Sequence, residues 1–281
     1  MGKVADSENL DFRDVHAWDG ETALLLSAGR PGKIFKTTDG GKNWVETYSN
    51  KSEGVFFNAM DFWDDQNGIA ISDPVNGRFL LIRTQDGGET WHAMPGERIP
   101  KPAKGEAQFA ASGTCLTVYG DSAVWFATGG PVARVFRSLN RGKTWAVSET
   151  DMLHGASSQG IFSLTFGTSD FGLLVGGDYK NESADSLNAA FTEDSGKTWQ
   201  IIGKNQPSGF RECVVPIPDA SSNIWLAIGP SGSDLSWDNG KSWNPINLSD
   251  LHAVDFAPHH NVGWAVGKNG KMVKLSWRAS E

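Results

Sequence analysis

Short apolar segments recur along the whole chain and are separated by turns rich in glycine, aspartate and asparagine. Two of these segments are FNAMDFW at 57–63 and GIAISDP at 68–74. They are too short for ordinary helices, and each is bounded by turn residues, so each predicts a β-strand. The chain is therefore expected to be a long series of short strands joined by tight turns, which is the pattern of an all-β protein.

One turn is repeated five times with nearly the same sequence. The shared pattern is Ser or Thr, any residue, Asp or Asn, any residue, Gly, any residue, then Thr, Ser or Asn, and finally Trp. Successive tryptophans are 47, 54, 54 and 44 residues apart. The Asp or Asn oxygen can accept backbone N–H bonds, the glycine allows a positive φ, and the tryptophan can pack between sheets. The five copies are Thr37–Trp44, Thr84–Trp91, Ser138–Trp145, Thr192–Trp199 and Ser236–Trp243.

The predicted strands fall into groups of four around these turns. A third strand leads into each repeated turn and a fourth follows its tryptophan, so that each group forms one antiparallel blade of a β-propeller. We predict an all-β fold, a β-propeller of six four-stranded blades, in a single domain spanning residues 1–281. A seven-bladed parent that lacks its first blade is the alternative. The first strands of the six blades begin near Phe12, Phe57, Gly113, Ile161, Phe210 and Leu251.

The sixth group is shorter than the others. It stops at KLSW (274–277), the point at which the fifth group, in DLSW (234–237), enters its repeated turn. The last blade therefore lacks its own fourth strand. Because an open edge invites aggregation, we expect residues around Lys3–Asp6 to supply this strand and to close the ring.

Composition narrows the range of partners. The 281 residues include 33 Gly and 12 Trp, which agrees with many turns and an all-β chain. The net charge of −8 disfavours binding to nucleic acid and to anionic membranes. No apolar stretch approaches the roughly 20 residues that span a bilayer. We expect a monomer that binds no nucleic acid and does not insert into a membrane.

Few residues suggest metal or redox chemistry. Cys115 and Cys213 are too few for a disulfide framework, have no metal-site spacing and are expected to be buried. No cofactor and no metal are predicted, since the chain contains no nucleotide-binding motif. The first residues contain no apolar signal core. The compartment therefore stays open: periplasmic or extracellular if a leader is removed, and otherwise cytoplasmic.

One face of the predicted propeller gathers polar residues that the strand pattern does not require. The second residue of a first strand lies near one mouth of the central channel, and the loops between second and third strands lie on the same face. We predict that these positions bind a polar or acidic ligand, either a protein segment or a glycan. The candidate residues are Arg13, Asn58, Arg134, Asp178, Tyr179, Arg211, Asp234 and His252.

An alternative role for some of these residues is structural. Asp178 and Asp234 could neutralise the arginines by pairing with them inside the chain.

Two long loops, Gly96–Ser112 and Asp178–Asn188, are also expected on this face, and long loops inside compact domains are disproportionately functional.

The five repeated turns resemble the Asp-box, or bacterial neuraminidase repeat. Units of the form FRDV…GWAVG…GKIFKTTDGGKNW resemble the photosystem II stability/assembly factor family and its relatives in non-photosynthetic bacteria. In that family the first strand often carries an arginine after its first apolar residue. Arg13 and Arg211 stand at that position, whereas four blades depart from it with Asn58, Thr114, Phe162 and His252. The resemblance implies a noncatalytic binding or scaffold propeller that recognises a protein segment.

The Asp-box resemblance also leaves an enzyme as the alternative function, because Asp-box propellers include sialidases and other glycoside hydrolases. The sialidase chemistry implied by that resemblance needs an arginine cluster and a tyrosine nucleophile. Arg13, Arg134 and Arg211 could form the cluster, with Tyr179 as nucleophile. A glycosidase with paired carboxylates is the other form of this alternative, and no catalytic residue is assigned. Its candidate carboxylates are Glu106, Asp178 and Glu212.

Overall fold

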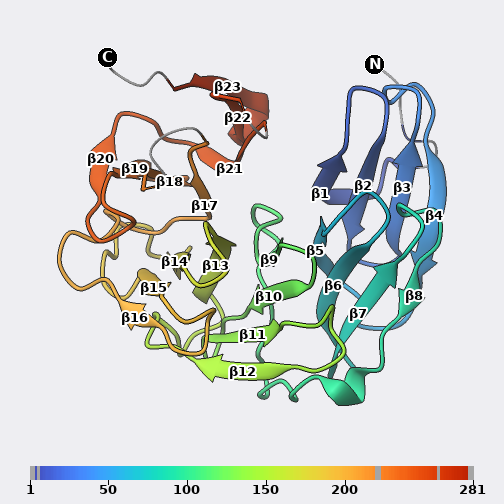
Figure 1. Cartoon of the computed structure of the whole chain (residues 1–281), viewed down its shortest axis with the longest axis horizontal. Helices are drawn as coiled ribbons and strands as arrows, with labels where there is room; N and C mark the ends of the chain where they lie inside the picture. Colours follow the sequence, from blue (N-terminus) through green and yellow to red (C-terminus); the bar gives the residue numbers. More distant parts are fainter. Residues whose placement is uncertain (1–3, 5–6, 219–222, 258–259, 278–281) are drawn as a thin grey trace. The chain divides into compact units, whose positions relative to one another are not determined.

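The computed structural model describes residues 4, 7–218, 223–257 and 260–277. These residues form six antiparallel sheets and almost no helix, and the strands of each sheet are neighbours in the sequence. Five sheets have four strands and the sixth has three (Figure 1). We number the sheets 1 to 6 in chain order.

The first three sheets contain strands β1 to β12. Sheet 1 comprises β1 (Asp11–Ala17), β2 (Ala23–Ala28), β3 (Gly32–Thr37) and β4 (Val45–Asn50). Sheet 2 comprises β5 (Phe57–Phe62), β6 (Gly68–Val75), β7 (Arg78–Thr84) and β8 (His92–Ala93), and the short 3-10 helix η1 (Gly96–Arg98) follows it. Sheet 3 comprises β9 (Leu116–Tyr119), β10 (Ala123–Ala127), β11 (Arg134–Ser138) and β12 (Ala146–Glu149).

The last three sheets contain strands β13 to β23. Sheet 4 comprises β13 (Gln159–Phe166), β14 (Gly172–Asp178), β15 (Ala189–Thr192) and β16 (Gln200–Ile201). Sheet 5 comprises β17 (Cys213–Pro216), β18 (Trp225–Gly229), β19 (Gly232–Ser236) and β20 (Asn244–Ile246). Sheet 6 comprises β21 (Leu251–Phe256), β22 (Val262–Gly267) and β23 (Lys271–Ser276), with the 3-10 helix η2 (Lys268–Gly270) before its last strand.

The chain divides into two compact units, and each is described by itself. Sheets 1 and 2 belong to unit 1, sheets 4 to 6 belong to unit 2, and sheet 3 has residues in both. Unit 1 consists of Met1–Pro102, Leu116–Trp125 and Arg137–Ala146, and unit 2 consists of Ala103–Cys115, Phe126–Phe136 and Val147–Glu281. The single domain expected from the sequence stays a prediction.

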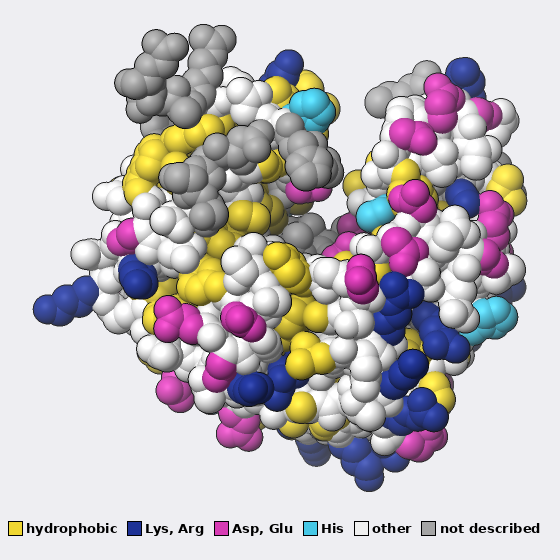
Figure 2. Space-filling model, viewed as in Figure 1, with side chains coloured by type: hydrophobic (Ala, Val, Ile, Leu, Met, Phe, Trp, Pro, Cys, Tyr) yellow, Lys and Arg dark blue, Asp and Glu magenta, His cyan; other side chains and the backbone are white. Residues whose placement is uncertain are grey.

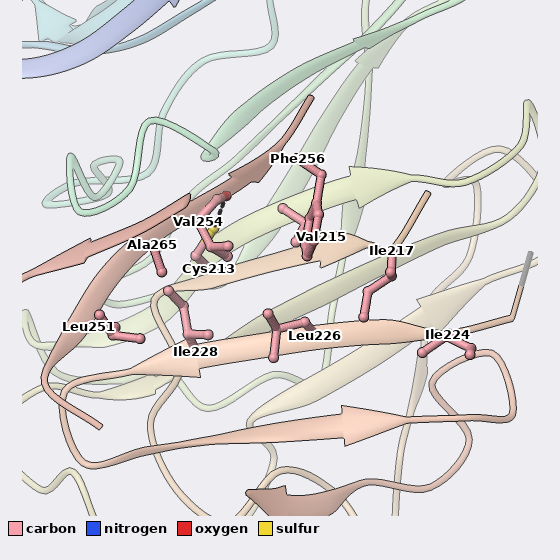
Figure 3. Close-up of a cluster of buried hydrophobic side chains, with 10 residues drawn as sticks. All are labelled: Cys213, Val215, Ile217, Ile224, Leu226, Ile228, Leu251, Val254, Phe256 and Ala265. Carbon is pink, nitrogen blue, oxygen red and sulfur yellow. Dashed lines mark hydrogen bonds between the residues drawn. The ribbon is translucent and has the colours of Figure 1, made fainter. Parts of the chain in front are cut away.

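Apolar side chains between successive sheets form the core. Alternate residues of a strand point to opposite faces of its sheet, so a sheet between two others is apolar on both faces. Figure 3 shows one such layer in unit 2, where Leu226 and Ile228 of β18 lie in the same cluster as Val254 of β21. The buried Cys213 thiol lies in this layer, with its Sγ 3.5 Å from the carbonyl oxygen of Val254.

The five repeated turns join the third and fourth strands of sheets 1 to 5. In the second copy, Asp86 accepts hydrogen bonds from the backbone N–H of Thr90 at 2.9 Å and from its hydroxyl at 2.6 Å. The Thr84 hydroxyl accepts a bond from the N–H of Gly88 at 2.9 Å. In the third copy the amide oxygen of Asn140 takes the place of the carboxylate. Each turn is therefore closed by its own polar side chains.

The predicted fold class, an all-β propeller with six blades, is confirmed. The sixth sheet has three strands among the described residues, as its sequence predicted. The prediction that Lys3–Asp6 completes this sheet falls on a segment of which only Val4 is described, and Val4 is in no strand. Within the described part of the chain, no helix is long and apolar enough to cross a membrane.

Candidate functional site

The loops that join second to third strands and those that join successive sheets form what we call the loop face. In unit 2 these loops are tied to one another by backbone hydrogen bonds. The N–H of Gly155 donates to the carbonyl of Gly130 at 2.8 Å, and that of Leu153 donates to Leu187 at 2.8 Å. Because loops of different sheets are joined in this way, side chains on them are held in fixed relative positions.

The first strands of four sheets have a β-bulge at the same position. The strand register shifts at Arg13, Asn58, Phe162 and His252, which are therefore the extra residues of the bulges in sheets 1, 2, 4 and 6. A bulge redirects a side chain out of the regular alternation of a strand. Counted from the turn between the first two strands, the equivalent residue of sheet 5 is Glu212, because Cys213 pairs with Ile228. Arg211 lies one residue before the position that the sequence alignment gave it.

Arg211 is enclosed by the chain. Its side chain is 1% exposed, and its Nε and Nη2 donate to Asp234 Oδ2 at 2.7 and 2.6 Å. Its Nη1 donates to the carbonyl of Phe210 at 2.8 Å. Asp234, also buried, accepts a further bond from the Ser208 hydroxyl at 2.9 Å. This guanidinium is therefore neutralised and hydrogen-bonded within the protein, and it connects the segment before β17 to β19.

Arg134 is held in a similar way by a carboxylate from the long loop. Its Nε donates to Glu106 Oε1 at 2.9 Å, and its Nη2 donates to the other oxygen of the same carboxylate. Glu106 is fully buried and also accepts bonds from the Thr128 hydroxyl and the Ala103 N–H, each at 2.6 Å. The pair fixes the part of the long loop that belongs to unit 2.

Two further polar pairs are partly open to solvent. His252 Nδ1 lies 2.5 Å from Glu212 Oε2, so the bulge residue of sheet 6 contacts its equivalent in sheet 5. Asp178 accepts bonds from the Gln159 side chain at 3.1 Å and from the Lys180 N–H at 2.9 Å. Partial burial acts to raise the pKa of Asp178, but these bonds and one from Ser158 lower it below its ordinary value. Asp178 is therefore ionised at neutral pH.

Three aromatic residues form what we call the aromatic ledge: Phe109, Phe162 and Tyr179. The rings of Phe109 and Phe162 are stacked, with centroids 3.8 Å apart, and Tyr179 meets both edge-on at 6.4 and 6.3 Å. Phe162 is buried, Phe109 is half-buried and Tyr179 is 44% exposed. Figure 2 shows hydrophobic side chains at the surface over the area of β13 and β14, with charged side chains around them.

Phe109 reaches this position because the backbone beneath it lacks side chains. A Cβ on Gly129 would come within 2.4 Å of the Phe109 ring, and one on Gly160 within 2.9 Å. These two glycines also pair with each other as an isolated bridge, and Gly129 pairs with Ala107 of the long loop. The glycines therefore determine where the ledge lies.

Unit 1 contains the other two candidate residues. Arg13 is exposed and forms an ion pair with exposed Asp11, with its Nη2 2.6 Å from Asp11 Oδ2. Asn58 is buried, and its Nδ2 donates to the Phe56 carbonyl at 3.0 Å and to Asp73 Oδ1 at 3.2 Å. Of the eight candidates, the structure brings Arg211 together with Asp234, and Asp178 lies beside Tyr179 in sequence at the end of β14. The ligand-binding role of all eight stays a prediction.

Sequence reasoning missed the aromatic ledge. Phe162 was noted only because it departs from the family pattern, and Phe109 lies in a loop with no counterpart in the other repeats. The length of that loop was its only signal. Within the described ranges, no three His, Cys, Asp or Glu side chains are grouped in a way that could hold a metal ion.

The candidate carboxylates of a glycosidase are all engaged in contacts of the protein itself. Glu106 has no exposed surface, Glu212 lies against His252, and Asp178 has a lowered pKa. A glycosidase acid needs a carboxyl that is protonated near the working pH, which usually requires a raised pKa. The pKa of Asp178 is shifted in the opposite direction, and Glu106 is buried against Arg134.

Comparison with known proteins finds similarity to Ycf48 proteins and to a GH74 enzyme. It is 22% identical to the photosystem II assembly lipoprotein Ycf48 of Synechococcus sp. (strain CC9902), over 93% of this chain and 84% of that protein. The solved structure of YCF48 bound to D1 peptide matches 98% of this chain and 84% of its own, at 17% identity and a TM-score of 0.59. A Niastella koreensis GH74 enzyme matches 94% of this chain and 44% of its own, at 13% identity and a TM-score of 0.60.

No family model matches the chain. The structural matches share less than a fifth of their residues with it, so they support the fold alone. The sequence match to Ycf48, in contrast, extends along nearly the whole chain. The chain is thus similar to the photosystem II assembly factor Ycf48, and the resemblance that its repeats predicted is confirmed.

Proposed function

We propose that this protein is a noncatalytic propeller that binds a polar or acidic protein segment on its loop face. The observation that carries the proposal is a contrast within that face in unit 2: its arginines are buried and neutralised by carboxylates, whereas an aromatic side chain is exposed. Arg134 and Arg211 are held by Glu106 and Asp234, whereas Tyr179 is open to solvent. A partner would meet Tyr179 and the polar groups around it.

The chemistry of this surface suits a peptide. A tyrosine offers a large apolar ring and a hydroxyl, and two packed phenylalanine rings hold it in place at little cost in conformational entropy. Asp178 and Gln159 beside it supply hydrogen-bond acceptors and donors for a peptide backbone, and His252 with Glu212 supplies a second polar pair. The solved YCF48 complex contains a D1 peptide, which supports a protein segment as ligand.

A glycan or a glycosidase substrate is the second ligand class. It is favoured by similar solved structures that include the GH74 enzyme and a Penicillium chrysogenum α-L-arabinanase complexed with arabinobiose. Binding without hydrolysis is the better match to the site, because Glu106 and Glu212 are engaged by Arg134 and His252 and the pKa of Asp178 is lowered.

Fluorescence polarisation with a labelled D1 peptide and a panel of acidic and neutral synthetic peptides tests the proposal. Tyr179→Ala should weaken binding at least tenfold, because the exposed ring is lost, while the unfolding midpoint stays within error. Tyr179→Phe separates the ring from its hydroxyl and should retain most of the affinity. Val45→Ala removes an exposed apolar side chain from β4 and serves as the matched control.

Two results would contradict the proposal. One is equal binding of every peptide by the wild type and by Tyr179→Ala. The other is turnover of arabinan or of nitrophenyl glycosides that is lost in Glu106→Gln, Asp178→Asn or Glu212→Gln, which would make the protein a glycosidase.

A further inference from the structure

A histidine lies among aromatic rings where sheet 1 packs against sheet 2, in what we call the aromatic seam: His16, Trp18, Phe62 and Trp91. His16 of β1 packs against Phe62 of β5, with ring centroids 4.5 Å apart, and meets Trp18 edge-on at 4.8 Å. Phe62 in turn meets Trp18 at 4.9 Å and Trp91 of the second repeated turn at 5.9 Å. All four residues belong to unit 1. The imidazole is therefore enclosed by the packing of two neighbouring sheets.

The seam offers the imidazole rings and no acceptor. Among the residues that the structure describes, none forms a hydrogen bond with the His16 side chain. A protonated imidazole has two N–H donors and a full charge, and a buried charge without hydrogen bonds is costly. The neutral ring, in contrast, packs as an aromatic group. These surroundings therefore favour the neutral form of His16.

Three charged groups from other elements lie around the seam. Lys36 of β3 has its Nζ 5.9 Å from the centroid of the Trp18 ring. The same Nζ donates to Glu89 Oε1 of the second repeated turn at 2.7 Å, so this carboxylate is already paired. Asp65, in the turn between β5 and β6, attracts a charge on His16. A protonated His16 would thus have one attracting carboxylate and one lysine nearby.

The other carboxylates on the elements of this seam are engaged by other groups. Asp14 of β1 accepts a bond from the Met60 N–H at 2.7 Å. Asp64, in the turn between β5 and β6, pairs with Arg141. Asp86 is bonded within its own repeated turn. These contacts keep the three carboxylates in place at other partners.

The balance of these effects makes folding depend on pH. Burial lowers the pKa of His16 from its ordinary 6.5 to about 4, although attraction to Asp65 acts to raise it. The unfolded chain therefore binds the proton more tightly than the folded protein does. The contribution of neutral His16 to stability is complete above pH 6.5 and is lost as the pH falls from about 6.5 towards 4.

Packing alone does not require a histidine at this position. His16 stands in the second residue pair from the turn between the first two strands, and Asp61 and Val215 are its equivalents in sheets 2 and 5. Val215 is buried and apolar. Asp61 accepts bonds from the N–H groups of Phe62 and Val118, each at 2.8 Å. His16 has neither the apolar character of the first nor the hydrogen bonds of the second, and what it adds is a response to acid.

We propose that the aromatic seam is an acid-sensitive joint, in which protonation of His16 loosens the packing of sheet 1 against sheet 2. The proton places a charge between the rings and near Lys36, and separation of the two sheets lets water solvate that charge. Sheet 1 then opens locally while the rest of the protein stays folded. The proposal concerns unit 1 and does not depend on the proposed binding site in unit 2.

Thermal unfolding between pH 7 and pH 4.5 tests the proposal with matched variants. His16→Phe keeps an aromatic ring in the seam and cannot be protonated. Between pH 6.5 and 4.5 the unfolding midpoint of the wild type should fall by about 5 °C more than that of His16→Phe. His16→Gln, a second variant without a titrating ring, should show the same flatter profile. His92→Gln removes an exposed imidazole from β8 and should keep the wild-type profile.

Hydrogen exchange locates the opening. After correction for the intrinsic effect of pH on exchange, β1 and β5 should lose protection in the wild type between pH 6.5 and 4.5 and retain it in His16→Phe. The strands β17 and β18 of sheet 5 should keep their protection in both proteins.

Three results would overturn the proposal. One is a parallel pH dependence of the unfolding midpoint in the wild type and in both His16 variants. Another is titration of the His16 ring near its ordinary pKa of 6.5 in NMR spectra of the folded protein. The third is an equal loss of protection in sheets 1 and 5, which would mean that acid unfolds the protein as a whole and not at this joint.

Discussion

Arg211 and Arg13 are chemically the same residue, each paired with an aspartate, in two different environments. Arg211 and Asp234 are buried together in unit 2, where Arg211 also donates to the Phe210 carbonyl and Asp234 accepts a bond from the Ser208 hydroxyl. Arg13 and Asp11 are exposed on β1. A buried charge pair is costly to break, whereas an exposed pair contributes little. The comparison teaches that burial, and not residue type, decides which arginine supports the fold.

The largest effect is expected from breaking the buried pair. Arg211→Ala leaves the Asp234 carboxylate buried without its partner, which should reduce the free energy of unfolding by about 3–5 kcal/mol. Urea denaturation measures this loss. A stability equal to that of the wild type would contradict the assignment of Arg211 to the interior.

A loss of similar size is expected in the apolar layers, and it should differ between two copies of one repeated turn. Trp243 is 5% exposed, packs with Leu173 and Trp225, and donates from its indole to Gly240 at 2.9 Å. Trp243→Ala should cost about 3–5 kcal/mol. Trp199, the equivalent residue of sheet 4, is half-buried, so Trp199→Ala should cost clearly less. Equal losses would show that the exposure of these rings does not govern their contribution.

A smaller effect concerns acid stability and the charge of the repeated turns. The hydrogen bonds of Asp86 lower its pKa from the ordinary 3.8 to about 2 although desolvation opposes them, and the pKa of Asp39 is lowered to about 2 chiefly by the Asn43 N–H. A carboxylate with a lowered pKa stabilises the folded state above its ordinary pKa. That contribution is lost as the pH falls from about 4 towards 2.

The third repeated turn supplies the control, because its Asn140 makes the backbone bond without a charge, at 2.9 Å from the N–H of Thr144. Asp86→Asn should therefore fold normally at pH 7 and lose less stability than the wild type between pH 4 and 2. Thermal unfolding midpoints over this pH range measure the difference. Parallel pH profiles for both proteins would show that Asp86 does not contribute to acid unfolding.

The smallest effect is expected from the exposed pair. Arg13→Ala should change the free energy of unfolding by less than about 1 kcal/mol, because solvent and salt screen the contact with Asp11. Denaturation of this variant beside Arg211→Ala makes the comparison direct. A loss as large as that of Arg211→Ala would show that Arg13 is enclosed in the folded protein.

The sequence predicted those features of the molecule that repeat. Five turns with the same residues at the same spacing gave the positions of the third and fourth strands, and the apolar segments between them gave six sheets. Repetition makes such features visible because each copy has the same local physical requirements. The three strands of the last sheet were also predicted, since Trp277 corresponds to the residue at which the fifth repeat enters its turn.

The site was less predictable because its contacts join residues far apart in the chain. Arg134 and Glu106 come from different segments, and Glu106 lies in a long loop that has no counterpart in the other repeats. A difference of one residue at the start of sheet 5 also matters: Glu212, and not Arg211, is the equivalent of His252 and contacts it, while Arg211 lies in the interior. Alignment of apolar segments did not resolve this shift, because Cys213, Val214 and Val215 are all apolar and show no alternation that would set the register.

Hydrogen exchange in the presence and absence of a bound peptide tests the central claim most directly, namely that the exposed part of the loop face binds while its buried ion pairs support the fold. The account predicts that a peptide selected by binding to the wild type slows exchange in 105–112 and 178–183, which contain Phe109 and Tyr179, with no change in the five repeated turns. Protection confined to the repeated turns, or absent from both of these segments, would contradict it.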